Sequence, residues 1–195
     1  DSIIFTSNRS TPIAGDWYGI QLQGTGKDLN VQYARFEGYS QLFKIRSLGI
    51  WNPSSWSDVP ITTVRNCVFR SGLYNVLEGT GYQSSNRSWL FKDNHLEFTG
   101  GGIYIWESYS PRFIAKNNNF VNVSNNLIQA SDIFHETSNL DSNICVISNN
   151  TFGGYLGDVY AGTAIYVRPY RKSDNASHVR RIEIKNNNIN GGGSF

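Results

Sequence analysis

The stretch IAKNNNF, residues 114–120, places three consecutive asparagines between an apolar pair and a phenylalanine. Asparagine is disfavoured inside helices and strands alike. It tolerates the left-handed backbone conformation and hydrogen-bonds to nearby backbone groups, so it suits sharp turns. The stretch therefore predicts a strand over its first residues and a tight turn at its asparagines.

The same pattern recurs along the chain, which indicates a repeat architecture. The further copies are NVQYARF (30–36), TVRNCVF (63–69), LFKDNHL (90–96), VISNNTF (146–152) and EIKNNNI (183–189). The last positions of successive copies are 33, 27, 24, 32 and 37 residues apart. The shortest repeat therefore takes 24 residues, and the longer repeats carry insertions.

Alignment of the copies gives columns of one chemical type. The residue before each copy and the second residue of each copy are mostly apolar and lie two apart, which is the period of a strand with one buried face. The seventh position is apolar again. The fourth and fifth positions are rich in asparagine: Asn66, Asp93, Asn117, Asn149 and Asn186 at the fourth, and Asn94, Asn118, Asn150 and Asn187 at the fifth. If the turns stack, side-chain amides of successive layers can bond to one another.

A second apolar strand is expected after each asparagine turn. The candidate segments are NVLEG (75–79), GIYIW (102–106), NLIQA (126–130) and AIYVR (164–168). Three short strands of ~3.3 Å per residue, joined by tight turns, would use up one repeat, and successive layers would lie ~4.8 Å apart.

The chain resembles the right-handed parallel β-helix family, the solenoid of pectate-lyase-like and Asn-ladder surface proteins. IAKNNNF, VISNNTF and IEIKNNNI carry the resemblance best, and GDWYGIQL (15–22) is similar to a segment common in first coils of such proteins. A leucine-rich horseshoe is disfavoured because its regular leucine spacing is missing. The resemblance implies an all-β, single-stranded solenoid of about six to seven coils with loop insertions.

Composition is compatible with one domain spanning residues 1–195, which can be a fragment of a longer chain because it starts at Asp1 and lacks methionine. The net charge of +2 gives no support for a nucleic-acid partner. No apolar run reaches 18 residues, so no transmembrane segment is expected. Neither a cofactor nor a metal is expected.

Five Asn-x-Ser/Thr sequons fit a secreted or cell-surface protein, although such motifs also arise by chance in a chain with 22 asparagines and 22 serines. They begin at Asn8, Asn86, Asn122, Asn149 and Asn175. The two cysteines, Cys67 and Cys145, fall in different columns of repeats three layers apart, at ~14 Å from the strand spacing, so two buried free thiols are expected.

One candidate ligand surface is the third column of the repeat, which alternates with buried positions. It contains Arg65, Lys92, Lys116 and Lys185, interrupted by Ser148. Such a cationic column suits an acidic polysaccharide lying along the solenoid. The alternative is a solvated face without a ligand.

Aromatic residues form a second candidate surface. GIYIWESY should bury Ile103 and Ile105 and therefore expose Tyr104 and Trp106, and the insertion WNPSSW adds Trp51 and Trp56. Flat rings with a polar edge suit sugar rings or protein partners. The alternative is that the insertions fold back and these aromatic residues form a satellite core.

Three functional hypotheses remain open. The first is a non-catalytic extracellular or cell-surface module with a structural or glycan-binding role. The second is a lyase or hydrolase of an acidic polysaccharide, with Lys92, Lys116 and Glu97 as candidate catalytic residues, although no column stacks two carboxylates. The third is a fibre subunit that self-associates through uncapped solenoid ends, because NNNINGGGSF (186–195) shows no cap.

The remaining polar segments give no recognisable motif. Asp132, His135, Glu136 and Asp141 in SDIFHETSNLD (131–141) match no metal-binding spacing, and a solvated loop is the favoured interpretation. The basic segment RPYRKSDNASHVRR (168–181) is interpreted in the same way, with anion binding as the alternative.

Overall fold

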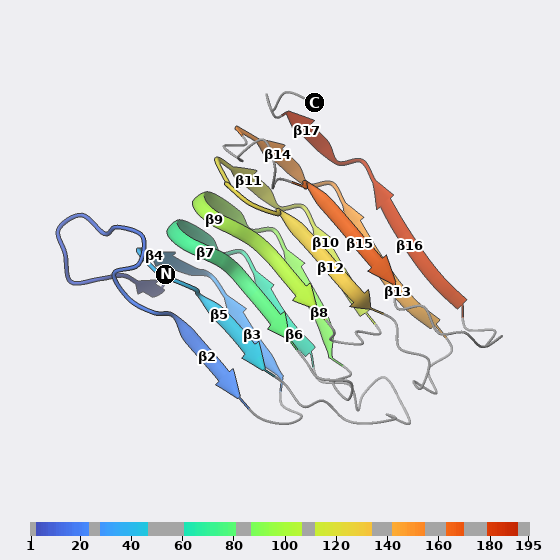
Figure 1. The fold of residues 1–195 in the computed structure, drawn as a ribbon, viewed down its shortest axis with the longest axis horizontal. Helices are drawn as coiled ribbons and strands as arrows, with labels where there is room; N and C mark the ends of the chain where they lie inside the picture. Colours follow the sequence, from blue (N-terminus) through green and yellow to red (C-terminus); the bar gives the residue numbers. More distant parts are fainter. Residues whose placement is uncertain are drawn as a thin grey trace.

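The structure is a computed structural model, and it describes residues 3–23, 28–46, 61–80, 87–106, 112–133, 142–154, 163–169 and 179–190. Every regular element in these ranges is a β-strand, and the strands form two sheets. Every strand pair in them is parallel. In Figure 1 the strands lie side by side in chain order, from blue β2 at one end to red β16 and β17 at the other. The all-β prediction is confirmed.

The six-stranded sheet contains the first strand of each repeat. Its strands are β3 (Leu29–Gln32), β6 (Ile61–Arg65), β8 (Ser88–Lys92), β10 (Arg112–Lys116), β13 (Ser142–Ser148) and β16 (Val179–Lys185). They pair strictly in chain order. Strands that pair in this way belong to a layered structure, in which each repeat stacks on the one before it.

The register of this sheet confirms the columns expected from the sequence. The second positions of the repeats are register partners: Val31, Val64, Phe91, Ala115, Ile147 and Ile184. Those in the middle of the stack, from Val64 to Ile147, are buried. A shift of one residue would turn this apolar column outward, so burial of one face fixes the register.

The 11-stranded sheet contains the later strands of each repeat. Along its main path lie β1 (Ile3–Phe5), β4 (Ala34–Glu37), β7 (Val68–Thr80), β9 (His95–Trp106), β11 (Asn119–Val121), β14 (Thr151–Gly153) and β17 (Asn188–Asn190). Four more strands, β2 (Ile20–Gln23), β5 (Phe43–Arg46), β12 (Ile128–Ile133) and β15 (Ile165–Pro169), pair with one another and with the second halves of β7 and β9. We call the part formed by β2, β5, these second halves, β12 and β15 the aromatic face. The second apolar strands expected at 75–79, 102–106, 126–130 and 164–168 all belong to it.

A second corner, which no sequence pattern predicted, separates the aromatic face from the rest of this sheet. Its residues share a left-handed backbone and follow one another in register: Gly38, Ser71, Phe98, Asn122 and Gly154, with φ between 51° and 72°. The strands β7 and β9 continue through this corner, and their register shifts just after it, between Gly72 and Asn75. Phe98 is 54% exposed, so a bulky side chain occupies an unfavourable conformation without burial in return.

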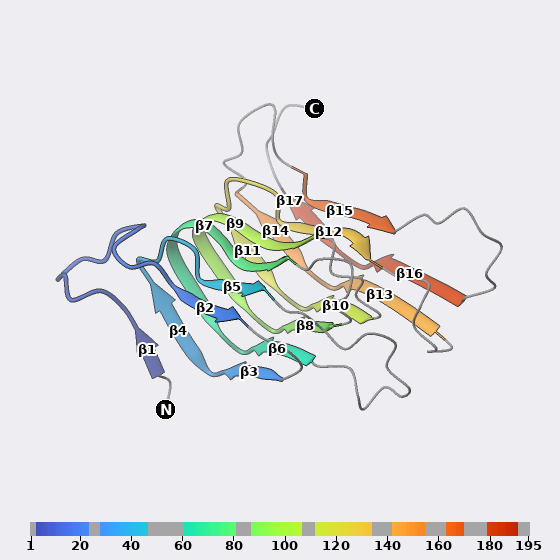
Figure 2. The same cartoon turned by 60° about the horizontal axis from the view of Figure 1, so that its bottom comes forward.

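Buried apolar residues of both sheets form a single core cluster. Figure 2 shows the six-stranded sheet lying below the strands of the aromatic face. The seventh positions stack along this core: Phe36 and Phe69 have ring centroids 5.5 Å apart, and Phe120 and Phe152 are 4.9 Å apart. Phe5 in β1 extends the same column by one layer, 4.8 Å from Phe36. Each buried phenylalanine contributes roughly 1.5–3 kcal/mol from burial, so this column is a main source of cohesion.

Contact across the core shows that the six-stranded sheet and the aromatic face oppose each other. Trp89 projects from β8, and a Cβ added to Gly79 of β7 would lie 2.4 Å from its ring. A side chain at position 79 would therefore displace the indole. Glycine here makes room for a tryptophan that spans the interior.

The last layer is less covered than the middle of the stack. Ile182, Ile184 and Ile189 occupy columns whose members in the middle of the stack are buried, yet they are 42%, 51% and 57% exposed. Apolar side chains of the last layer, in β16 and β17, are therefore exposed.

Candidate functional site

The fourth positions of the repeats form what we call the asparagine corner. Asn66, Asp93, Asn117, Asn149 and Asn186 all have φ between 53° and 57°. This is the left-handed conformation that asparagine and aspartate tolerate best after glycine. The turn predicted from IAKNNNF is therefore confirmed in every copy that carries the amide or carboxylate.

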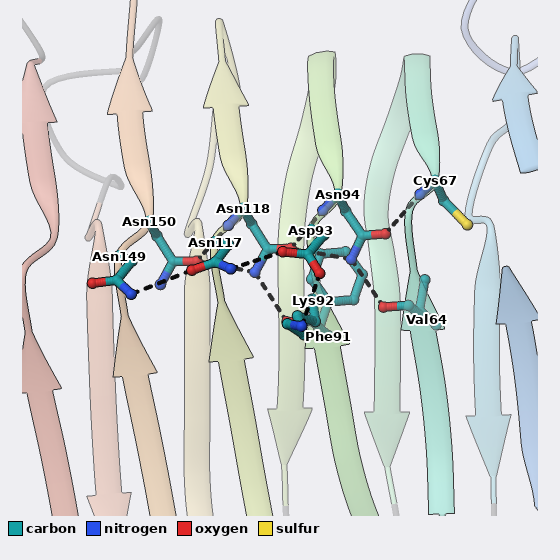
Figure 3. A network of polar contacts seen from close by, with 10 residues as sticks. All are labelled: Val64, Cys67, Phe91, Lys92, Asp93, Asn94, Asn117, Asn118, Asn149 and Asn150. Carbon is teal, nitrogen blue, oxygen red and sulfur yellow. Dashed lines mark hydrogen bonds and ion pairs between the residues drawn. The ribbon is translucent and has the colours of Figure 1, made fainter. Parts of the chain in front are cut away.

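The fifth positions form a hydrogen-bonded ladder behind this corner (Figure 3). Oδ1 of Asn118 accepts from the backbone N and from Nδ2 of Asn94, both at 3.1 Å, and Asn150 repeats the arrangement with Asn118. Nδ2 of Asn118 also donates to the Phe91 carbonyl at 3.0 Å. Asn187 continues the ladder by accepting from Asn150. The predicted amide ladder is confirmed.

Cys67 ends the ladder at its first layer. Its backbone N donates to Asn94 Oδ1 at 3.0 Å, and its Sγ lies 3.8 Å from the Val31 carbonyl, the position that an asparagine Nδ2 reaches in later layers. Burial raises the pKa of this thiol and raises that of Cys145 to about 12. Both cysteines are free and buried, as predicted, and both are poor nucleophiles.

The residues of the cationic column are in register, but a nearby carboxylate offsets part of their positive charge. Arg65, Lys92 and Lys116 are partners in successive strands. Lys92 lies 3.1 Å from Asp93, which also accepts from Asn117 at 2.8 Å. Burial raises the pKa of Asp93, but the bonds from Asn117 and Lys92 outweigh burial and leave this pKa below its ordinary value. Asp93 is therefore ionised at neutral pH and offsets part of the positive charge.

The three candidate catalytic residues do not converge. Lys92 and Lys116 lie on the six-stranded sheet, whereas Glu97 lies past the asparagine corner on β9, paired with Arg70 at 2.9 Å. Glu37, Arg70 and Glu97 are register partners in successive strands and alternate in charge. A surface ion pair of this kind contributes little, and it supplies no second carboxylate to the lysines.

The aromatic face collects the other predicted residues. Ile103 and Ile105 are fully buried, Tyr104 is half-buried and Trp106 is 40% exposed, so the expected alternation is confirmed. Register places Tyr104 beside Gln129 and then Tyr166, and Trp106 beside Ser131 and then Arg168. We call these six outward positions on β9, β12 and β15 the aromatic array.

Polar side chains occupy the middle strand of the array: Gln129 lies between Tyr104 and Tyr166, and Ser131 lies between Trp106 and Arg168. Ser131 is only 2% exposed, whereas Tyr166 beside Gln129 is 39% exposed. Asn126 Nδ2 donates to Gln129 Oε1 at 2.7 Å, and Gln129 Nε2 donates to Ser131 Oγ at 3.2 Å. These bonds hold the amide in place between Tyr104 and Tyr166.

A second polar group, which we call the polar triad, lies on the same face towards β5. It contains Gln41, Lys44 and Glu78. Lys44 Nζ lies 3.2 Å from Glu78 Oε1, and Gln41 Nε2 donates to Glu78 Oε2. Glu78 is the register partner of Tyr104, so the polar triad and the aromatic array are contiguous.

Glycines 100–102 bring the backbone of β9 close to its neighbours just before Tyr104. A Cβ at Gly100 would lie 1.8 Å from the Leu73 carbonyl, and one at Gly102 would lie 2.1 Å from the Leu127 carbonyl. The run TGGG is therefore needed where the chain turns into the aromatic face.

Sequence reasoning missed Tyr166, Gln129 and the polar triad. AIYVR and NLIQA are predicted strands. Strict alternation of buried and outward residues within them predicts that Tyr166 and Gln129 point outward. The triad gave no such signal, because Lys44 and Gln41 lie in a segment outside the aligned repeats. Trp51, Trp56, His135 and Glu136 lie outside the described residues.

Within the described ranges, His, Cys, Asp and Glu form no group of three that would hold a metal ion. None of the described residues belongs to a helix long and apolar enough to cross a membrane. Comparison with known proteins finds no family model, no curated protein and no solved structure that matches this chain.

Proposed function

We propose that this protein is a right-handed parallel β-helix module of six to seven coils, secreted or displayed at the cell surface, which binds a glycan through the aromatic array. The chain-order pairing of both sheets and the stacked corners support the solenoid. The five sequons are consistent with an extracellular location.

The observation that carries the binding proposal is the combination of exposed rings with fixed amides in one contiguous patch. Tyr104, Trp106 and Tyr166 offer apolar ring faces, against which the C–H faces of a sugar ring pack. Gln129 offers a donor and an acceptor at a position set by its own hydrogen bonds. Sugar hydroxyls need both kinds of partner, and a patch of rings and amides supplies them.

The cationic column is a weaker candidate for the same role. Asp93 neutralises part of its charge, and Lys185 is paired with Glu183 at 2.9 Å. Long solvated cations also lose side-chain entropy when they are held by a ligand. The aromatic array presents stiffer side chains, so less entropy is lost on binding.

The test is retention on a panel of immobilised glycans. Wild-type protein is expected to be retained by at least one glycan, and Trp106→Ala and Tyr104→Ala are each expected to weaken this retention about tenfold or more, as for the loss of a stacked ring. Tyr33→Ala is the matched control, because Tyr33 is 57% exposed on the asparagine corner, away from the array. Equal retention of all four proteins, or retention of none by any glycan, would reject the proposal.

A second candidate role is self-association through the end of the stack, favoured by the exposure of Ile182, Ile184 and Ile189. Sedimentation velocity at increasing protein concentration tests it. Ile184→Lys should then abolish any concentration-dependent species, and a monomer at all concentrations would reject this role.

A further inference from the structure

The side chains of the polar triad are largely buried and hold one another in position. The side chains of Lys44 and Glu78 are only 18% and 16% exposed, and Gln41 is 8% exposed. Lys44 Nζ also lies 3.4 Å from Gln41 Oε1, so all three side chains contact one another. Each carboxylate oxygen of Glu78 keeps capacity for a further hydrogen bond, because an oxygen of this kind accepts more than one.

The triad and the aromatic array together are longer across the strands than along them. Apart from Gln41, their residues lie on β5, the second halves of β7 and β9, β12 and β15, which are neighbours in that order. Four strand spacings amount to ~19 Å, whereas two outward positions on one strand span only ~7 Å. A ligand that contacts the whole patch is therefore extended and lies parallel to the direction of stacking.

The charges at the polar triad disfavour an acidic group at that end of the patch. The Lys44 charge is compensated by Glu78 at 3.2 Å, and a uronate placed over the triad would face the Glu78 carboxylate. Amide and hydroxyl groups provide the other polar contacts. Register places Arg46 and Arg168 at the two ends of the row that contains Trp106 and Ser131. The inference of an uncharged ligand therefore rests on the compensated charge at the triad.

We propose that the polar triad is a second subsite for the glycan and that this glycan is an uncharged, linear polysaccharide lying across the strands from β5 to β15. This inference rests on the proposed glycan binding at the aromatic array. Glu78 accepts hydrogen bonds from sugar hydroxyls, Lys44 holds the carboxylate in position, and the rings of the array pack against the following sugars.

The test compares soluble uncharged polymers, namely a mixed-linkage β-glucan, a galactomannan and a glucomannan, with polygalacturonate and alginate by affinity gel electrophoresis. Binding of an uncharged polymer is expected to be insensitive to salt and to strengthen with chain length in a series of its oligosaccharides.

Glu78→Gln is expected to weaken binding of the uncharged polymer about tenfold, the effect of one hydrogen bond to a charged group. Lys44→Met is expected to weaken it as well. Glu37→Gln is the matched control, because Glu37 is paired with Arg35 on another part of the sheet.

The outcomes separate this inference from the one on which it rests. If Trp106→Ala abolishes binding while Glu78→Gln and Lys44→Met leave it unchanged, the array binds glycan and the second subsite is rejected. If the acidic polymers bind more tightly, lose affinity in salt and depend on Arg168→Gln, the uncharged class is rejected. If no polymer binds, both proposals fail. Urea unfolding of each variant shows whether a lost signal reflects a lost fold.

Discussion

The two corners of this stack solve the same backbone problem in different ways. At the asparagine corner, the left-handed residue is almost always asparagine or aspartate, and the residue after it builds a buried ladder of amides. At the second corner, the same conformation is occupied by glycine, serine, phenylalanine and asparagine in turn, without a ladder. The asparagine is repeated at the corner where the side chains bond to one another, and the residue type varies at the corner where it is the backbone conformation that is shared.

The largest effect is expected from Asn118→Ala in the buried ladder. The change leaves the backbone N and Nδ2 of Asn94 and the Phe91 carbonyl without their partner. Buried polar groups without partners cost about 1–3 kcal/mol each, so we expect a loss of about 3–5 kcal/mol in the free energy of unfolding, measured with urea. Asn117→Gly is the control, since Asn117 is exposed and glycine keeps its left-handed backbone. It loses only exposed hydrogen bonds, to Asp93 and from Asn149, so a loss of about 1 kcal/mol or less is expected. Equal losses in the two variants would show that the ladder is not what distinguishes this corner.

An intermediate effect is expected from Gly100→Ala, two residues past the second corner. The added Cβ would meet the Leu73 carbonyl, which is backbone and cannot rotate away, so we expect a loss of about 1–3 kcal/mol from overpacking. Gly153→Ala is the matched control, because its Cβ would find nothing closer than 4.0 Å. Similar thermal unfolding midpoints for both variants would contradict the close approach at Gly100.

The smallest effect, and one of opposite sign, is expected from Phe98→Asn. A phenylalanine at φ 52° is strained, and at 54% exposure its ring buries little apolar surface. Asparagine tolerates this conformation, so we expect a gain of about 1 kcal/mol in the free energy of unfolding. Tyr33→Asn at the other corner, with φ 52° and 57% exposure, should give a similar gain. Loss of stability in the Phe98 variant alone would mean that its ring is held by contacts that Tyr33 lacks.

The strands of the repeat and the register of the six-stranded sheet were predictable from the sequence alone. Alignment on the asparagines gave the correct partners for Lys92 and Lys116 and for Phe120 and Phe152. This was possible because period-2 burial and the left-handed turn both restrict residue type. The strand β1 was not predicted, because Phe5 is its only residue that matches a column of the repeat.

The candidate site was predictable only in part. Tyr104 and Trp106 followed from the alternation in GIYIW. Their neighbours Gln129 and Tyr166 lie at different distances from the asparagine turns that precede them, so alignment on those turns does not give their register. The cationic column was correctly aligned. The sequence did not show that the Asp93 carboxylate offsets part of its charge, because that depends on the orientation of the Asp93 side chain at the turn.

The sequence by itself determined the asparagine corner, the buried columns and the free thiols, because each follows from a local rule that every copy obeys. Only the tertiary structure decided the second corner and the contact between the aromatic array and the polar triad. Those features arise from strand pairing between residues far apart in the chain, and such pairing leaves no fixed residue type at the positions it brings together.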